Sequence, residues 1–142
     1  MLKISMEILL HSVVNYLGDY ASENCPLLLE TPAGETGELF WKMEEFINFM
    51  KSLKFHIKNK VQVCIDTCHV FAAGYQPSTY IKHLLENNIK IGLIHYNDSR
   101  MGCGCKKDQH APPDSGRGFI GLEELTRVLE LTTLHNIPCV CE

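Results

Sequence analysis

Four short apolar runs in the sequence each end in a side chain that can bind a metal ion. The four end residues are Glu30, Asp66, His95 and Glu142. Side chains alternate along a strand, and neighbouring parallel strands end at the same edge of a sheet. We therefore expect these side chains to lie together, where α/β proteins place their active sites. Because clustered carboxylates repel one another unless a cation neutralises them, the pattern predicts a metal site. Its mixed carboxylate and imidazole ligands suit Zn, Mn or Fe.

A second set of possible ligands lies further along the sequence. His69 follows Asp66 by three residues, so both can face one pocket if a helical turn begins there. Together with Asp108 and His110, His69 could hold one metal ion with an open position, as catalytic zinc sites require. The alternative for a strand-end carboxylate is a helix N-cap or a hydrogen-bonded loop residue, and for Asp108 and His110 it is a solvated loop. The repetition over four strands favours the metal site.

The cysteines indicate the cellular compartment of the protein more clearly than they indicate a metal site. Seven Cys is an odd number, and their spacing does not suggest a disulfide framework. We therefore expect a reducing, intracellular location, in the cytoplasm or the nucleus. Cys103 and Cys105 could form a four-thiolate zinc site with Cys139 and Cys141. However, the second pair is predicted on the strand face opposite Glu142, where both thiols would pack against helices as small hydrophobes. The role of Cys103 and Cys105 is left open: as loop thiols, they could bind metal or become oxidised.

The apolar pattern predicts that helices and strands alternate. Helices are expected at residues 1–22, 39–50, 77–88 and 122–134, and strands at 26–31, 61–66, 91–95 and 138–142. The run at 26–31 lacks polar alternation, which is typical of a parallel sheet covered on both faces. An irregular loop at about 97–119 is long enough to indicate a function. The order predicts an α/β fold of parallel β/α units, in one domain over residues 1–142.

Composition excludes several classes of protein. The chain has 142 residues, a formal net charge of -4, 45% hydrophobic and 21% charged residues, which excludes a disordered chain and a polybasic nucleic-acid tail. DNA binding stays possible, because bound metal ions can supply positive charge. No apolar run reaches the roughly 18 residues that span a bilayer, so no membrane partner is expected. The first residues resemble a weak signal peptide, but Glu7, His11 and Asn15 interrupt them at helical spacing, which favours an amphipathic helix.

Several stretches of the sequence together resemble the endonuclease IV family, the zinc-dependent apurinic/apyrimidinic (AP) endonucleases of AP endonuclease family 2. The stretches are Leu29–Gly34, Cys64–Tyr75, His95–Ser99 with Asp108–His110, Phe119–Gly121 and Cys141–Glu142. The resemblance implies a TIM (β/α)8 barrel with three zinc ions at the carboxyl ends of its strands. A complete barrel has eight strands, whereas four are predicted here. The chain therefore resembles strands five to eight, the C-terminal half of the barrel, in truncated form.

The resemblance also implies a role for each candidate residue. Glu30 resembles the carboxylate that bridges the first two zinc ions, and it is the expected catalytic residue because it could also orient the attacking hydroxide. The other ligands of the second zinc would be Asp66, His95 and Glu142. The complete ligand set of the third zinc would be His69, Asp108 and His110. The two histidines that complete the first zinc site belong to the other half of the family fold, so fewer than three zinc ions are expected here. Thr31–Pro32, Gln109 and the segment 111–118 depart from the family pattern.

The implied activity is hydrolysis of the phosphodiester 5′ to an abasic site in double-stranded DNA, in base excision repair. One alternative is a sugar isomerase or epimerase of the xylose-isomerase-like barrels, which also place Glu, Asp, His and Glu around one divalent ion. Such an enzyme has no need of His69, Asp108 and His110. A second alternative is a non-catalytic half-barrel. The strands that end at Glu30 and Glu142 would then be open edges, and such edges favour self-association.

Overall fold

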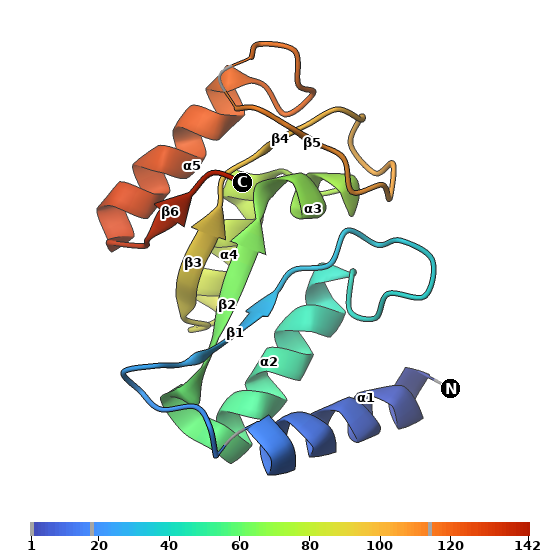
Figure 1. Cartoon of the computed structure of the whole chain (residues 1–142), viewed down its shortest axis with the longest axis vertical. Helices are drawn as coiled ribbons and strands as arrows, with labels where there is room; N and C mark the ends of the chain where they lie inside the picture. The colour runs from blue at the N-terminus through green and yellow to red at the C-terminus, as the bar shows by residue number, and fades with distance from the viewer. Residues whose placement is uncertain (1, 18, 114) are drawn as a thin grey trace.

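The centre of the protein is a four-stranded parallel sheet, seen in the computed structural model, which describes residues 2–17, 19–113 and 115–142 (Figure 1). The strands follow the order β1-β2-β3-β6, and all three pairings are parallel. Their bounds are β1 Leu27–Glu30, β2 Val61–Asp66, β3 Ile91–His95 and β6 Cys139–Val140. The predicted α/β fold with parallel β/α units is therefore confirmed, and β1 and β6 are the two edges of the sheet.

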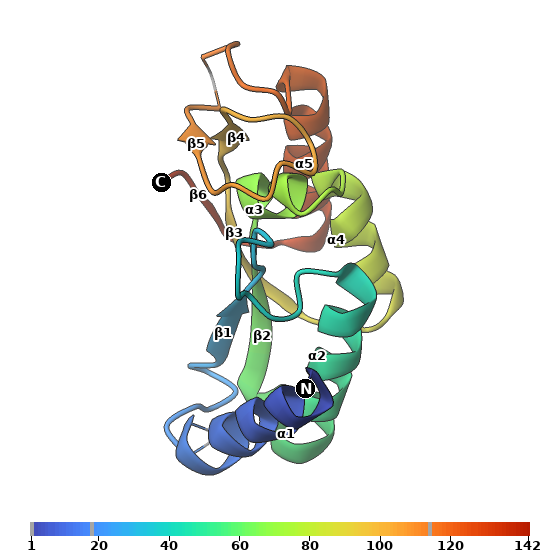
Figure 2. The same cartoon turned by 90° about the vertical axis from the view of Figure 1, so that its right-hand side faces the viewer.

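Helices lie on one side of this sheet (Figure 2). They are α1 Leu2–Ser12, α2 Met43–Ile57, α3 Thr67–Ala72, α4 Pro77–Glu86 and α5 Leu122–His135, with a π-helical turn at Val13–Leu17 and a 3-10 turn at Lys58–Lys60. Every residue of β2 is nevertheless buried, as expected of a strand covered on both faces, whereas β1 is only partly buried. Of the described residues, no helix combines the length and the apolar character needed to cross a membrane.

Several predicted bounds differ from the observed ones. The first helix ends before residue 22, because Asp19 and Tyr20 already lie in a turn, and residue 18 lies outside the described residues. The helix predicted at 39–50 begins at Met43 and continues to Ile57. The last strand is two residues long, so Glu142 lies beyond it rather than within it. In each case the apolar pattern indicated the element correctly, but the bounds depend on contacts with other parts of the chain.

The long loop predicted at 97–119 is partly regular. Its two short strands, β4 Asp98–Ser99 and β5 His110–Ala111, pair antiparallel, with Ser99 opposite His110. The carboxylate of Asp98 accepts hydrogen bonds from the backbone N–H groups of Ser99 (2.7 Å) and Ile120 (2.9 Å). A Cβ atom at Gly118 would collide with this carboxylate. The pairing brings His110 back to the point where β3 ends.

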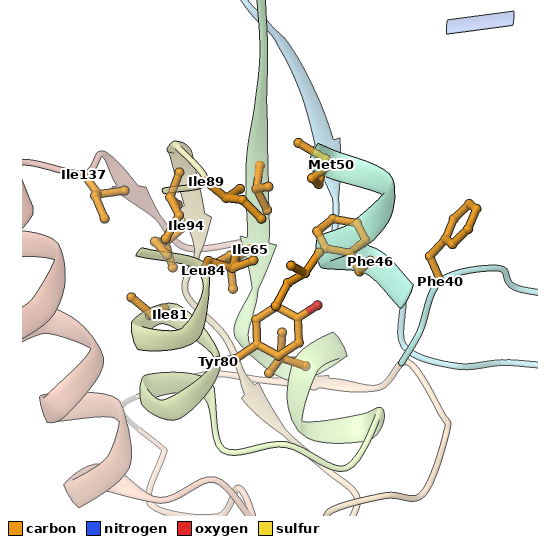
Figure 3. Close-up of a cluster of buried hydrophobic side chains, with 14 of the residues drawn as sticks. Phe40, Phe46, Met50, Ile65, Tyr80, Ile81, Leu84, Ile89, Ile94 and Ile137 are labelled. Atoms are coloured by element: carbon orange, nitrogen blue, oxygen red, sulfur yellow. The ribbon is translucent and has the colours of Figure 1, made fainter. Parts of the chain in front are cut away.

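The core fills the space between the sheet and the helices (Figure 3). Helix α2 has apolar side chains at helical spacing, and Leu53 among them is fully buried. Ile65 of β2 and Ile94 of β3 lie opposite each other in register and are also fully buried. Alternation along these strands leaves Asp66 and His95, which are likewise paired, on the other face at the carboxyl ends. The packing of the core therefore sets the position of the predicted ligands.

Candidate metal centre

The structure brings the seven predicted ligand residues together at the carboxyl ends of the strands. The first group contains Glu30, Asp66 and His95, whose ligand atoms lie within 4.8 Å of one another. His95 Nδ1 is 3.2 Å from Glu30 Oε1 and 4.0 Å from Asp66 Oδ2. Glu142 Oε1 also lies 3.2 Å from His95 Nδ1. Four residues from four strand ends thus surround one point, although Glu142 lies beyond its strand.

The second group contains His69, Asp108 and His110, again with ligand atoms within 4.8 Å of one another. His69 Nε2 is 3.2 Å from Asp108 Oδ2, and His110 Nε2 is 3.0 Å from Asp108 Oδ1. Both Nε2 atoms are buried, and neither makes a hydrogen bond of acceptable geometry with any described residue. Buried polar atoms of this kind are costly unless a ligand satisfies them. Two nitrogens and a carboxylate that converge in this way fit the ligand set of a zinc ion.

Short distances connect the two groups. His110 Nε2 lies 3.5 Å from Asp66 Oδ2, and His69 Nδ1 lies 3.5 Å from Glu30 Oε1. Asp66 is fully buried, whereas the carboxylates of Glu30, Asp108 and Glu142 are 42%, 45% and 44% exposed. One side of the cluster is therefore fixed within the protein, while the other side is accessible to solvent. Such an arrangement can hold more than one cation and leave coordination positions open.

The two carboxylate oxygens of Asp66 have different surroundings: one caps a helix and the other faces the candidate metal site. Its Oδ1 atom accepts a hydrogen bond of 2.9 Å from the backbone N–H of His69 and so caps helix α3. Its Oδ2 atom faces His95 and His110. The helical turn that α3 provides carries His69 into the same cluster. One oxygen atom of Asp66 therefore serves as the helix N-cap, and the other is directed at the place where a cation would bind.

The environment of His69 is electrostatically negative. Burial by itself lowers the pKa of His69, but Asp66, Asp108, the carbonyl oxygen of Thr31 and Glu30 outweigh it, and the net effect is a raised pKa. A cation therefore competes with a proton for this ring. The Nδ1 atom of His69 lies 2.9 Å from the carbonyl oxygen of Thr31. An N–H at Nδ1 that donates to this carbonyl would leave the Nε2 lone pair directed at the cluster.

Asn97 is a buried residue of the site that the sequence pattern did not single out. Its Nδ2 atom donates to Asp66 Oδ2 at 2.8 Å, and its Oδ1 atom accepts from the Glu142 backbone N–H at 3.2 Å. Its own backbone N–H donates to Thr67 Oγ1 at 2.8 Å. Thr31 acts similarly, because its Oγ1 accepts from the Asp66 backbone N–H at 3.1 Å. The available signal was the position of these residues directly after, or close to, a predicted ligand.

Within the described part of the chain, the only group of possible metal ligands that includes a cysteine is Asp66, Cys68 and His110. Cys139 packs against the core as expected, but Cys141 is exposed, because β6 ends at Val140 and the alternation stops there. Cys68 lies beside Asp66 and His110, yet its thiol donates to the Gln109 carbonyl oxygen at 3.5 Å. Burial is the main reason that the pKa of Cys68 is raised to about 11. This thiol is therefore a poorer ligand than the carboxylates and imidazoles around it.

Comparisons with known proteins agree with this geometry. The family model described as xylose isomerase-like TIM barrel matches residues 7–142. Proteins of this class are parallel β/α barrels. Half of such a barrel would have four strands, with ligands at their carboxyl ends. Probable endonuclease 4 of Sulfurihydrogenibium sp. is 36% identical over 128 residues, which are 84% of this chain and 44% of that protein. Probable endonuclease 4 of Mycoplasma mobile is 35% identical over 145 residues, which are 99% of this chain and 50% of that protein.

A solved structure shows the same relationship. The crystal structure of endonuclease IV from Thermus thermophilus superposes with a TM-score of 0.71 at 26% identity. The match covers 100% of this chain and 51% of that chain. The chain therefore belongs to the endonuclease IV family of the xylose isomerase-like TIM barrels. It spans about half the length of the curated relatives that it matches.

Proposed function

We propose that this chain carries a zinc centre of an AP endonuclease, an enzyme that hydrolyses the phosphodiester 5′ to an abasic site in double-stranded DNA. The observation that supports the proposal most directly is the pair of buried Nε2 atoms on His69 and His110, which converge on Asp108 without a hydrogen-bond partner among the described residues. This group would hold one zinc ion. Asp66, His95 and Glu142 would hold a second, which Glu30 would share.

Zinc ions bound here would supply Lewis-acid chemistry, which activates water and neutralises charge on a phosphate group. The residues of the chain contribute the geometry. Glu30 is 42% exposed and can orient a water molecule from the open side of the cluster. Asn97 fixes the Asp66 carboxylate by donating a hydrogen bond of 2.8 Å from its Nδ2 atom. An abasic nucleotide is the expected substrate because it unstacks at less cost than an intact one.

The charge of the chain limits how DNA would bind. The formal net charge is -4, which disfavours strong nonspecific binding to phosphates by this chain alone. Zinc ions would offset the carboxylates at the centre, so that attraction to DNA would be concentrated at the site. Base excision repair is the process in which such an activity acts. We propose DNA with an abasic site as the partner.

A sugar isomerase is the alternative enzyme. Its single divalent ion would need only the group of Glu30, Asp66, His95 and Glu142. The second group, centred on Asp108 with its two histidine neighbours, favours the nuclease because a one-ion isomerase has no use for it. A non-catalytic role for the chain alone is the other alternative, because the chain spans about half the length of its relatives.

Cleavage of an abasic DNA duplex in the presence of zinc tests the proposal. We expect little or no cleavage by the 142-residue chain alone, because Glu30 would be the sole protein ligand that it offers to the first zinc. Cleavage is expected after addition of the amino-terminal half of the Mycoplasma mobile relative, and it should be lost in His69→Ala but kept in the surface variant His83→Ala. Robust cleavage by the chain alone would contradict the account of the incomplete first site. Absence of cleavage by the reconstituted barrel would contradict the nuclease, and a sugar-isomerase assay would follow.

A further inference from the structure

Two loops that follow different strands meet beside the second ligand group. One is the loop of residues 31–42 after β1, and the other contains residues 100–109 between β4 and β5. Glu35 Oε1 accepts a hydrogen bond of 3.1 Å from the backbone N–H of Asp108. Lys106 Nζ lies 3.8 Å from the centroid of the Trp41 ring, which places a cation on an aromatic face. Both contacts tie the loop that carries Asp108 to the loop that follows Glu30.

The first loop has an ordered turn of its own. Glu38 Oε2 accepts hydrogen bonds from the backbone N–H groups of Gly34 (2.7 Å) and Glu35 (2.8 Å). Gly34 has a φ of +87°, and a Cβ atom there would lie 3.4 Å from Lys106 Cγ and from the Trp41 side chain. The turn therefore presents Glu35 and Trp41 to the second loop in a defined arrangement.

The second loop is fixed to helix α3 near its middle. The backbone N–H of Gly104 donates to the Phe71 carbonyl oxygen at 3.0 Å, and that of Lys106 donates to the Ala72 carbonyl oxygen at 2.9 Å. The hydrogen bond from Asp108 to Glu35 is the next backbone anchor along the chain. Because the Asp108 side chain is 45% exposed, packing does little to fix its carboxylate. Its position therefore depends on these anchors and on the hydrogen bond of 2.9 Å that the Arg100 backbone N–H donates to the adjacent Gln109 carbonyl oxygen.

We propose that Glu35, Lys106 and Trp41 are positioning residues that hold Asp108 between His69 and His110, and that they thereby set the affinity of this group for zinc. The inference rests on the proposed function only in taking zinc as the ligand. Residues that orient a metal ligand without touching the metal commonly change metal affinity when they are replaced. Lys42 provides a contrast, because its Nζ lies farther from the same ring, at 5.6 Å, and also forms an ion pair of 3.2 Å with Glu45.

The chain contains one tryptophan, so the fluorescence of Trp41 reports directly on this contact. We expect Lys106→Ala to change the emission of the zinc-free protein and to weaken zinc binding about fivefold, as a lost cation–π contact at an exposed site predicts. Zinc affinity is measured by competition with a chromophoric chelator. Lys106→Arg should restore both readouts, because guanidinium groups also stack on aromatic rings. The matched variant Lys42→Ala should leave zinc affinity unchanged.

A second pair of variants tests the hydrogen bond to Asp108. Glu35→Ala should weaken zinc binding about tenfold, whereas Glu35→Gln, which retains an acceptor oxygen, should bind almost as the wild type does. In the zinc-free protein, Glu35→Ala should also speed up hydrogen exchange at the Asp108 backbone N–H.

Unchanged emission and affinity in Lys106→Ala, or an equal loss of affinity in Lys42→Ala, would overturn the proposal. So would unchanged hydrogen exchange at Asp108 in Glu35→Ala. If the wild type bound no zinc while exchange and emission responded as expected, the positioning of Asp108 would stand and the proposed zinc function would fail.

Discussion

The side chain of Asn97 joins the carboxylate of Asp66 to the backbone of Glu142. It donates to Asp66 Oδ2 at 2.8 Å and accepts from the Glu142 N–H at 3.2 Å, and Asn97 itself is fully buried. Because the Asn97 amide is uncharged, it can lie next to the buried Asp66 carboxylate without the charge repulsion that another carboxylate would cause. In this way the end of β2 and Glu142, two residues beyond β6, are held in a fixed relationship across the ends of the sheet.

The first prediction concerns the stability conferred by this amide. We expect Asn97→Ala to lower the free energy of unfolding by about 2–3 kcal/mol, because it removes the side-chain hydrogen bonds to the buried Asp66 carboxylate and to the Glu142 backbone N–H. Urea unfolding in the presence of a chelator measures the effect on the zinc-free protein. Asn48→Ala, at an exposed position of α2, is the control and should stay within about 0.5 kcal/mol. Equal stability of the two variants would show that the Asn97 contacts contribute nothing.

The second prediction concerns the zinc content of the purified chain. We expect fewer than three zinc ions per chain, with the tightest held by the group around His69. Replacement by Ala in His69→Ala removes a buried nitrogen ligand and should therefore reduce the zinc content, as measured by elemental analysis. The control His83→Ala changes a side chain that is 44% exposed and pairs with Glu86 outside the centre. The assignment fails if His69→Ala retains as much zinc as the control.

The third prediction concerns the core that positions the strand ends. Leu53 is fully buried in α2, whereas Phe55, two residues later on the same helix, is 84% exposed. Leu53→Ala should lower the free energy of unfolding by about 2–5 kcal/mol, since it removes apolar contacts and leaves a cavity. Phe55→Ala should change it by less than about 0.5 kcal/mol. Thermal or urea unfolding of both variants distinguishes a specific core from general hydrophobicity.

The fourth prediction concerns the two open edges of the sheet. Each of β1 and β6 has a strand partner on one side only among the described residues, and Val140 at the β6 edge is 46% exposed. Edges of this kind pair readily with other chains. We expect the chain to form dimers or larger species at high concentration, as measured by light scattering. Val140→Lys should reduce this association, because a charged side chain protects an edge, whereas Phe55→Lys should not. A monomer at every concentration would contradict the prediction.

Local patterns in the sequence predicted the elements and the clustering of the candidate ligands for a clear physical reason. Burial alternates along a strand, so the last residue of β2 or β3 is fixed relative to its apolar neighbours. Asp66 and His95 therefore lie in register as the pattern requires. The parallel order followed from the alternation of helices and strands. Glu142 was placed correctly near the others, even though its strand is shorter than predicted.

Interactions between distant positions could not be predicted in the same way. The role of Asn97 depends on hydrogen bonds to residues 31 and 45 positions away, and neither leaves a periodic signal. The pairing of Ser99 with His110 joins two strands of two residues each, which is too short for a pattern of alternation. Exposure of Cys141 follows from the early end of β6, and the ends of strands are set by tertiary contacts more than by propensity.

The contact between Gly118 and the Asp98 carboxylate has a consequence for how this loop can diverge among relatives. Every other residue type at position 118 would introduce a Cβ atom where the carboxylate lies, so this position tolerates no substitution without loss of the contact. Pro112 and Arg117, in contrast, are exposed. Insertions and deletions can therefore accumulate between the β5 strand and Gly118 while both ends of the segment stay anchored. The length of this loop can drift over evolutionary time without displacing His110.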